Sequence, residues 1–395
     1  MIAEKMKPLV ANNSAVREMF EEGARLKGIY GDENVYDFSL GNPNVAPPQA
    51  IMNAIIDILN EEPANRVHGY MSNAGFETTR YAVAESLNRR FGTSYTEHNI
   101  IMSVGAGSAL NVILKTILNP GEEVITFAPY FLEYGGYVRN YDGELVVVPA
   151  DTETFQPNLD AFEELLSEKT RAVIINTPHN PTGVIYSDET LKHLTRILLK
   201  QEAENGSPIF LISDEPYREL AYDGAVVPWV PDYYKDTIVG YSFSKSLSLP
   251  GERIGYIVIP NQVEDHENVI TAATIATRVM GMVNAPSLMQ LVIERCIDEK
   301  CDIAFYENNR NQLYNGLTGF GFECVKPEGA FYLWMKSPVP DEKEFVEAAK
   351  EFNILMVPGS SFACPGYVRL AYCVSFETIM SSMEGFGKLA EKYGL

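Results

Sequence analysis

The sequence predicts an α/β fold: a large domain with a mostly parallel seven-stranded sheet that includes one antiparallel strand, and a smaller α+β domain. Seven short apolar runs, rich in β-branched residues, lie between residues 99 and 259. Longer amphipathic stretches separate most of them, a pattern typical of buried parallel strands joined by crossover helices. The seven runs are 99–103, 123–127, 144–148, 171–176, 208–213, 237–243 and 254–259.

The length and pattern of the segments between these runs predict how the strands are connected. Helical patterns occur at 108–118, 159–166 and 187–201. The run at 254–259 begins roughly ten residues after the sixth run ends, whereas a parallel crossover needs a dozen or more residues. We therefore expect this strand to be antiparallel to its neighbour.

After residue 275 the alternation of apolar runs and helical patterns ends. Long helical patterns at 285–314, 342–351 and 376–392 surround brief strands at 329–334 and 367–371. We expect a large domain over residues 46–275 and a small C-terminal domain over residues 276–395. Residues 1–45 are expected to be an N-terminal segment that joins the small domain.

Composition limits the partners. The 395 residues carry 31 Lys and Arg against 53 Asp and Glu, a net charge of −22, which disfavours nucleic acid and anionic membranes as partners. The five cysteines form no C-x-x-C pair, and no apolar run reaches about 18 residues, so a cytoplasmic protein is expected. The five histidines never pair at ligand spacing, and no metal site is expected.

Polar residues follow the apolar runs directly. In an open parallel sheet, ligands bind outside the carboxyl ends of the strands, so these residues are candidates for a site. Each has an ordinary alternative, such as a tight turn, a helix N-cap or a solvated lysine, but their joint occurrence at successive strand ends favours a site. The residues concerned are Gly105, Ala106, Gly107, Phe131, Asn180, Asp214, Tyr217, Ser242, Ser244 and Lys245.

Two local motifs resemble those of other enzyme classes, but the residues that normally accompany each motif are absent. The turn at Gly105 begins like G-x-G-x-x-G, but Leu110 stands at the third glycine and no acidic residue ends the next strand, which disfavours a nicotinamide site. The spacing of Ser242 and Lys245 matches the S-x-x-K of serine β-lactamases, but no K-T-G occurs and the motif ends a strand instead of opening a helix.

In order and spacing, the motifs of residues 39–371 resemble the fold type I, class I and II aminotransferases, which use pyridoxal 5′-phosphate (PLP). The matching segments are Gly41-Asn-Pro43, Asn180-Pro-Thr-Gly183, Asp214-Glu-Pro-Tyr217, Ser242-Phe-Ser-Lys245, Arg253-Ile-Gly255, Pro327 to Trp334, Pro358-Gly359 with Phe362, and Arg369-Leu370. The resemblance implies a PLP enzyme and, by family habit, a homodimer.

The resemblance also assigns roles around the cofactor ring. Lys245 would form the Schiff base with PLP and move the proton during transamination. Asp214 would pair with the pyridine nitrogen, while Asn180 and Tyr217 would donate to the ring hydroxyl oxygen. Phe131 would stack on the ring face.

The remaining roles concern anionic groups. The phosphate would lie on the amides of the Gly105–Gly107 turn, at Ala106 and Gly107, with Ser242, Ser244 and Arg253 around it. Tyr70 matches the family tyrosine that reaches a phosphate across the dimer interface. The substrate carboxylate would be held by Arg369, assisted by Asn180 and the backbone of Gly41.

The implied function is transfer of an amino group between an L-amino acid and a 2-oxo acid. An alternative on the same scaffold is a PLP-dependent C–S β-lyase similar to cystathionine β-lyase, and a PLP-binding regulator is disfavoured because no DNA-binding module precedes residue 40. Some aspartate-specific relatives carry a lysine where Gly107 stands, so the amino acid is left open. Arg278 lies near a position where other members present an arginine across the interface; its ordinary alternative is a solvated helix arginine.

Overall fold

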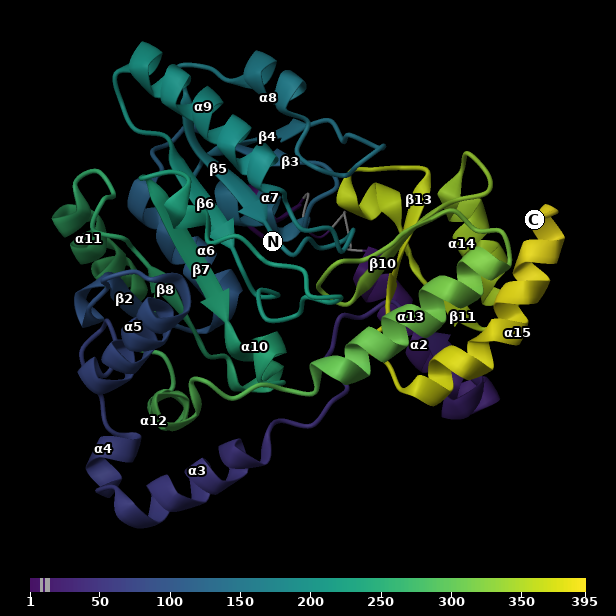
Figure 1. Ribbon diagram of the computed structural model, residues 1–395, viewed down its shortest axis with the longest axis horizontal. Coiled ribbons are helices and arrows are strands. Elements are labelled where there is room, and N and C mark those ends of the chain that lie inside the picture. The colour runs from purple at the N-terminus through teal and green to yellow at the C-terminus, as the bar shows by residue number, and fades with distance from the viewer. Residues whose placement is uncertain (8–9, 11–14) are drawn as a thin grey trace.

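The computed structural model describes residues 1–7, 10 and 15–395, and its largest feature is a seven-stranded sheet (Figure 1). The strand order is β2-β8-β7-β6-β5-β3-β4. Only β8 runs antiparallel to its neighbours β2 and β7, so the predicted fold class and the predicted antiparallel strand are confirmed. The strands are β2 (Ile100–Ser103), β3 (Glu123–Phe127), β4 (Glu144–Val148), β5 (Thr170–Asn176), β6 (Phe210–Asp214), β7 (Thr237–Ser242) and β8 (Gly255–Val258).

Both faces of this sheet are covered by helices, which explains why its strands are apolar without alternation. Within β5, Ile174 faces a core formed with α6 (Gly105–Ile117) and α11 (His266–Val279). Its neighbours Val173 and Ile175 face the opposite core, under α8 (Leu159–Leu165) and α9 (Asp188–Asn205). On that same face, α3 (Gln49–Glu61), α5 (Glu77–Phe91) and α12 (Ser287–Cys296) pack over β2, β7 and β8.

A second, antiparallel sheet organises the smaller part of the molecule, in the order β12-β13-β10-β9. Its strands are β9 (Cys324–Val325), β10 (Tyr332–Lys336), β12 (Val357–Pro358) and β13 (Tyr367–Ala371). The N-terminal strand β1 (Tyr36–Asp37) pairs in parallel with β11 (Ile354–Leu355) beside it. Figure 1 shows α2 (Ala15–Tyr30), α13 (Ile303–Gly319), α14 (Glu342–Lys350) and α15 (Phe376–Tyr393) around this sheet, on the side away from α5 and α11.

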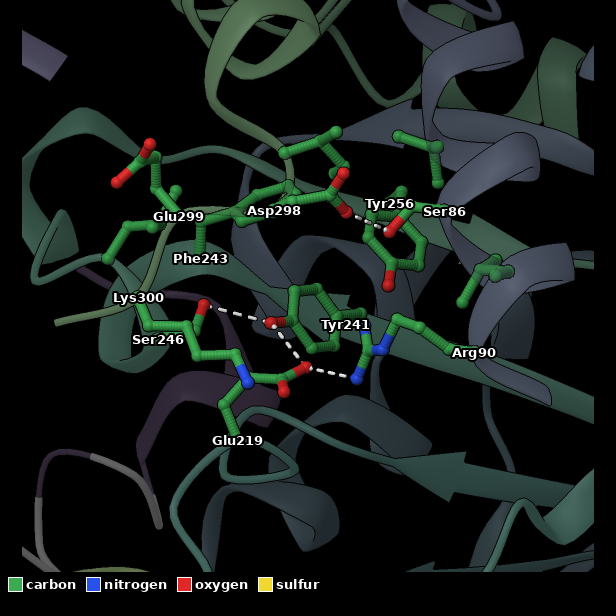
Figure 2. Close-up of a pocket in the computed structure, with 14 residues that line it drawn as sticks. Ser86, Arg90, Glu219, Tyr241, Phe243, Ser246, Tyr256, Asp298, Glu299 and Lys300 are labelled. Carbon is green, nitrogen blue, oxygen red and sulfur yellow. Dashed lines mark hydrogen bonds and ion pairs between the residues drawn. The ribbon is translucent and has the colours of Figure 1, made fainter. Parts of the chain in front are cut away.

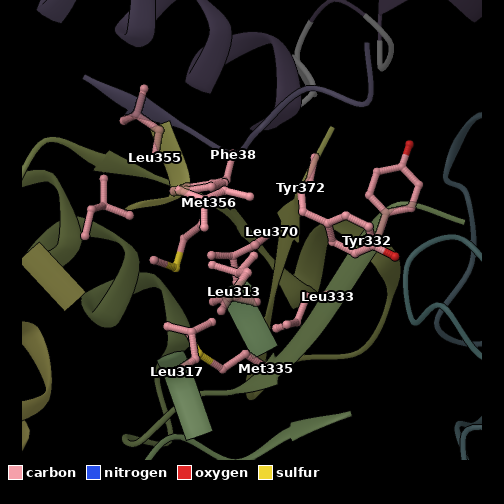
Figure 3. Close-up of a cluster of buried hydrophobic side chains, with 14 of the residues drawn as sticks. Phe38, Leu313, Leu317, Tyr332, Leu333, Met335, Leu355, Met356, Leu370 and Tyr372 are labelled. Carbon is pink, nitrogen blue, oxygen red and sulfur yellow. The ribbon is translucent and has the colours of Figure 1, made fainter. Parts of the chain in front are cut away.

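The core of the smaller part joins residues far apart in the sequence. Phe38 from the N-terminal segment packs with Leu313 of α13, Met356, and Leu370 of β13, all of them fully buried (Figure 3). An apolar cluster of this size is held mainly by burial, at about 25 cal/mol per Å². The N-terminal segment is therefore an integral part of the smaller core.

The predicted helical pattern at 285–314 is wrong as one element, because α12 ends at Cys296 and α13 begins at Ile303. The Asp302 side chain accepts a hydrogen bond from the Phe305 amide and so starts a new helix. Helix α12 packs against α3, α5 and α4 (Ala64–His68), beside the large sheet. The predicted boundaries at residues 45 and 275 stay a prediction; we propose that the break between α12 and α13 is the better boundary.

Candidate active site

A cavity of about 430 Å³ lies at the carboxyl ends of the parallel strands, where the large sheet meets the smaller part. All predicted site residues except Gly105 and Tyr70 line it. Those that do are Gly41, Ala106, Gly107, Phe131, Asn180, Asp214, Tyr217, Ser242, Ser244, Lys245, Arg253 and Arg369. The cavity therefore collects residues from both parts of the fold.

Lys245 lies on α10 (Phe243–Ser246), a single turn that directly follows β7. The Ser242 side chain caps this turn by accepting from the Ser244 amide. The Lys245 Nζ donates a hydrogen bond of 2.7 Å to the carbonyl oxygen of Gly41. Burial, together with the positive charges of Arg253 and Arg369, lowers the pKa of Lys245 to about 8, so the amine is more readily unprotonated than an exposed lysine.

Asp214 is the last residue of β6 and is buried. Its Oδ2 accepts a 2.6 Å hydrogen bond from the hydroxyl of Tyr134, whereas its Oδ1 is buried with no hydrogen-bond partner among the described residues. Burial raises the pKa of Asp214 to about 7, although the Tyr134 hydrogen bond acts in the opposite direction. The free oxygen is positioned to accept a hydrogen bond from a ligand in the cavity.

The opposite end of the cavity suits an anion. Helix α6 begins at Gly105, directly after β2, and its first amides and helix dipole favour negative charge. The Arg253 guanidinium donates to the carbonyl oxygens of Pro250 and Val104 and so lies beside this helix end. Gly105 has φ +78°, and a Cβ there would lie 2.6 Å from Arg253 Nη2, so glycine is required at this position.

Arg369 comes from β13 of the smaller sheet and is buried. Its Nη1 donates to Asn180 Oδ1 at 3.1 Å and its Nη2 to the Ser39 carbonyl at 2.7 Å. The guanidinium lies over the rings of Tyr332 and Phe362, and its Nε is buried without a hydrogen-bond partner among the described residues. A buried cation that meets no carboxylate in the described part of the chain favours an anionic ligand.

Three residues in or beside the cavity wall were not predicted as site residues. Tyr134 follows Phe131 by three residues in a region with no motif, and its importance depends on its contact with Asp214. Tyr332 comes from β10, and its hydroxyl lies 2.8 Å from that of Tyr217. Asn176 ends β5 and links Asp214 to Asn180: its amide donates to the Asp214 carbonyl, and its Oδ1 accepts from the Asn180 amide. Asn176, at a strand end, and Tyr332, inside the matched segment 327–334, could have been found from the sequence, whereas Tyr134 could not.

Two other predicted positions lie outside the cavity. Tyr70 is 92% exposed, and Arg278 is an exposed residue near the end of α11. Neither lines the cavity within this single chain. Within the described part of the chain, no group of His, Cys, Asp and Glu could hold a metal ion, and no helix is long and apolar enough to cross a membrane.

A second cavity, of about 290 Å³, lies on the other side of α10 (Figure 2). Arg90 forms an ion pair with Glu219, and the Tyr241 hydroxyl lies within hydrogen-bond distance of both Glu219 and Ser246. These groups satisfy one another across the cavity, so we assign it no part in the site that contains Lys245.

Chemically, the first cavity offers an amine that can act as a nucleophile, and anion-binding groups on either side of it. An amine of lowered pKa adds readily to a carbonyl carbon. The fold and this site together define an α/β enzyme that uses amine chemistry on small anionic molecules.

The chain belongs to the aminotransferase class I and II family, whose model matches residues 33–384. It is therefore an aminotransferase, as the sequence motifs predicted, and the comparisons do not favour the C–S lyase alternative. Enzymes of this family depend in general on PLP.

Similar proteins cover almost the whole chain. An aspartate/prephenate aminotransferase of Thermus thermophilus is 30% identical over 98% of this chain and 97% of its own length. The crystal structure of an amino transferase from Eubacterium rectale is 46% identical, with a TM-score of 0.97 and complete coverage of both chains. The aspartate aminotransferase of Thermus thermophilus with maleate has a TM-score of 0.84 at 28% identity, over 95% of this chain and 96% of that one.

The raised pKa of Asp214 predicts a pH-dependent cost to stability in the protein freed of PLP. Because the folded pKa of about 7 exceeds the ordinary 3.8, this carboxyl contributes most stability below about pH 4, and the contribution is lost as the pH rises through 7. Asp214→Asn removes the titration. We expect the variant to gain stability over the wild type as the pH rises from 5 to 8, by at most about 3 kcal/mol, since one pKa unit corresponds to ~1.4 kcal/mol.

The measurement is thermal or urea unfolding of both proteins at several pH values. Other titrating groups are common to the two proteins, so the difference isolates Asp214. A stability difference that stays constant from pH 5 to pH 8 would contradict the raised pKa.

Proposed function

We propose that this enzyme uses PLP, bound in the cavity around Lys245, to exchange an amino group between an L-amino acid and a 2-oxo acid. The observation that carries the proposal is a set of three groups in that one cavity, none of which has an oppositely charged partner among the described residues: the Lys245 amine, the Asp214 carboxyl with its free Oδ1, and the Arg369 guanidinium. Each has the chemistry that one part of the reaction requires.

The residues present fit PLP. The buried, unpartnered Oδ1 of Asp214 would accept a hydrogen bond from the protonated ring nitrogen. Asn180 and Tyr217 would donate to the ring oxygen, and Phe131 would cover a ring face. When bound, PLP supplies an aldehyde that condenses with amines and a ring that withdraws electrons from the substrate.

The phosphate fits the other end of the cavity. The first amides of α6, at Gly105, Ala106 and Gly107, provide donors and the positive end of a helix dipole. Ser242 and Ser244 lie at the start of α10, and Arg253 supplies the guanidinium. In a chain with a net charge of −22, a dianion needs this local concentration of donors.

Lys245 is proposed to have two roles in turn. Its amine would hold the cofactor covalently until a substrate amine replaces it. The released Nζ would then take and return the proton at the substrate carbon, which its pKa of about 8 allows near neutral pH. An arginine could not act in this way because it stays protonated.

Arg369 would hold the α-carboxylate of the substrate. Asn180 accepts one of its hydrogen bonds and keeps the guanidinium aimed into the cavity. The Gly41 backbone lines the same region, where a Cβ would lie 2.0 Å from the Tyr332 hydroxyl. This close approach requires glycine and leaves the backbone accessible to the ligand.

The residues of the cavity indicate less about the side chain of the substrate than about its α-carboxylate. The relatives' names include aspartate, whose second carboxylate would need its own cation. The three cations that line the cavity, Lys245, Arg253 and Arg369, already have proposed roles, and Gly107 offers no charge. Aspartate use would therefore depend on a residue from a second copy, for which the exposed Arg278 is the candidate.

A homodimer is proposed because a single copy leaves an apolar surface exposed. Met52, Ile56 and Leu59 lie about one turn apart on α3 and are half exposed. Tyr70 follows in the same region and is 92% exposed. We propose that two copies bury this stripe against each other, and that Tyr70 then serves the phosphate end of the partner's cavity, as the family resemblance implies. The five free cysteines fit the reducing cytoplasm proposed for the enzyme.

The proposed function predicts that the purified protein with PLP converts part of a panel of twenty amino acids, read from the cofactor's visible absorbance as it changes to the amine form. Lys245→Ala should fold, bind PLP noncovalently and turn over negligibly. Lys300→Ala, at the other cavity, serves as the matched control with normal activity. Borohydride reduction followed by digestion should place the label on the peptide with Lys245. A label elsewhere, or no conversion of any amino acid, would overturn the proposed function.

Mixing two inactive variants tests the shared site. If Tyr70 serves the partner's site, a dimer of one Tyr70→Ala chain and one Lys245→Ala chain contains one intact site. Random reassociation of equal amounts should then restore about a quarter of the wild-type activity, because half of the dimers are mixed and each has one native site of two. If Tyr70 acts in its own chain, mixing restores nothing. If Tyr70 has no role, the Tyr70→Ala enzyme is already active before mixing.

A further inference from the structure

We infer that Tyr134 is a positioning residue for the cofactor: its hydroxyl orients the Asp214 carboxylate so that one oxygen faces the cavity, and its hydrogen bond favours the anionic form of the carboxyl. The inference rests on the proposed function, because the ring nitrogen of PLP is the group that the free oxygen would meet.

The hydrogen bond fixes the two oxygens of Asp214 in different roles. Tyr134 is the second residue of α7 (Glu133–Arg139) and is 1% exposed. Its hydroxyl lies 2.6 Å from Oδ2, while Oδ1 has no partner in the described part of the chain. Without Tyr134, nothing among the described residues would distinguish the two oxygens, and the carboxylate could turn about its own axis.

The surroundings of Asp214 make a donor necessary. Burial and the neighbouring carboxyl of Glu215 both favour the protonated form, which could not pair with a protonated ring nitrogen. Three further tyrosines, Tyr137, Tyr217 and Tyr186, lie near Asp214 or Tyr134 and carry no positive charge. Among the described residues, the Tyr134 hydrogen bond is thus the main interaction that favours the anion of Asp214. Burial also raises the pKa of Tyr134 well above its ordinary value, so this phenol remains a donor.

Packing holds the phenol in place. The ring of Phe131 meets the Tyr134 ring edge to face at 5.7 Å, and the ring of Tyr130 stacks on it at 6.3 Å. Tyr134 therefore also supports Phe131, the residue proposed to cover the cofactor ring. Removing only the hydroxyl separates these two contributions, because phenylalanine keeps the packing.

The test compares Tyr134→Phe with Tyr130→Phe in the holoenzyme. Tyr130 packs on the same ring but makes no hydrogen bond to Asp214, so it is the matched control. For Tyr134→Phe we expect kcat to fall roughly tenfold, with the KM for the amino acid changed less than about twofold. The pH at which the bound cofactor's visible absorbance titrates should rise by roughly half a unit or more, because the ring nitrogen holds its proton less firmly.

The double variant gives the decisive comparison. In the Asp214→Asn background, Tyr134→Phe should have no further effect on kcat or on the absorbance titration, because the carboxylate is already gone. If the single variant holds PLP too weakly for kinetics, the same comparison is made on the PLP dissociation constant. Additive effects would show that Tyr134 acts independently of Asp214 and would overturn the inference.

Two other results would also overturn it: a Tyr134→Phe enzyme that matches the wild type in kcat and absorbance titration, or a Tyr130→Phe enzyme that shows the same changes as Tyr134→Phe. Failure of the proposed function itself would be recognised separately. In that case the wild type would bind no PLP or convert no amino acid, whatever the variants do.

Discussion

The structure depends on burying charged groups without oppositely charged side chains to pair with them. Asp214 and Arg369 are both buried, and neither forms a salt bridge with another described residue. Such groups cost free energy in the folded chain unless hydrogen bonds compensate, which here come from Tyr134 to Asp214 and from Arg369 to Asn180 and Ser39. The apolar layers on both faces of the large sheet, with the separate core of the smaller part, supply the stability that permits this arrangement.

The strand ends explain how much of the site could be predicted. Asp214 ends β6, and Lys245 follows β7, so the rule that ligands bind at the carboxyl ends of parallel strands is enough to place them together from the sequence. Asn180 lies four residues past the end of β5 and is tied back to Asn176 by its amide. These residues are local to the sheet, and a regular pattern of apolar runs is enough to find them.

The residues that sequence reasoning missed depend on packing between distant segments. Tyr134 matters because α7 brings its hydroxyl to a strand end 80 residues away, and Tyr332 meets Tyr217 across 115 residues. No local pattern marks Tyr134, and the matched segment 327–334 contains Tyr332 but assigns it no role. The break between α12 and α13 was missed for a related reason: helical periodicity continues through it, but the Asp302 cap and the packing of α12 on the large sheet end the first helix. Tyr70 lies outside the cavity of its own chain, and its role across an interface stays a prediction.

Backbone hydrogen bonds close to the site fix the position of the smaller part relative to the large sheet. The amides of Glu328 and Gly329 both donate to the Gly183 carbonyl, and the amide of Ala330 donates to Leu220. A Cβ on Gly183 would lie 2.6 Å from Pro327, so the two segments approach too closely for any side chain there. Since β10 follows these residues and pairs with β13, the same contacts set the position of Arg369 relative to Asn180. These backbone contacts therefore hold Arg369 in register with the strand-end residues around Lys245.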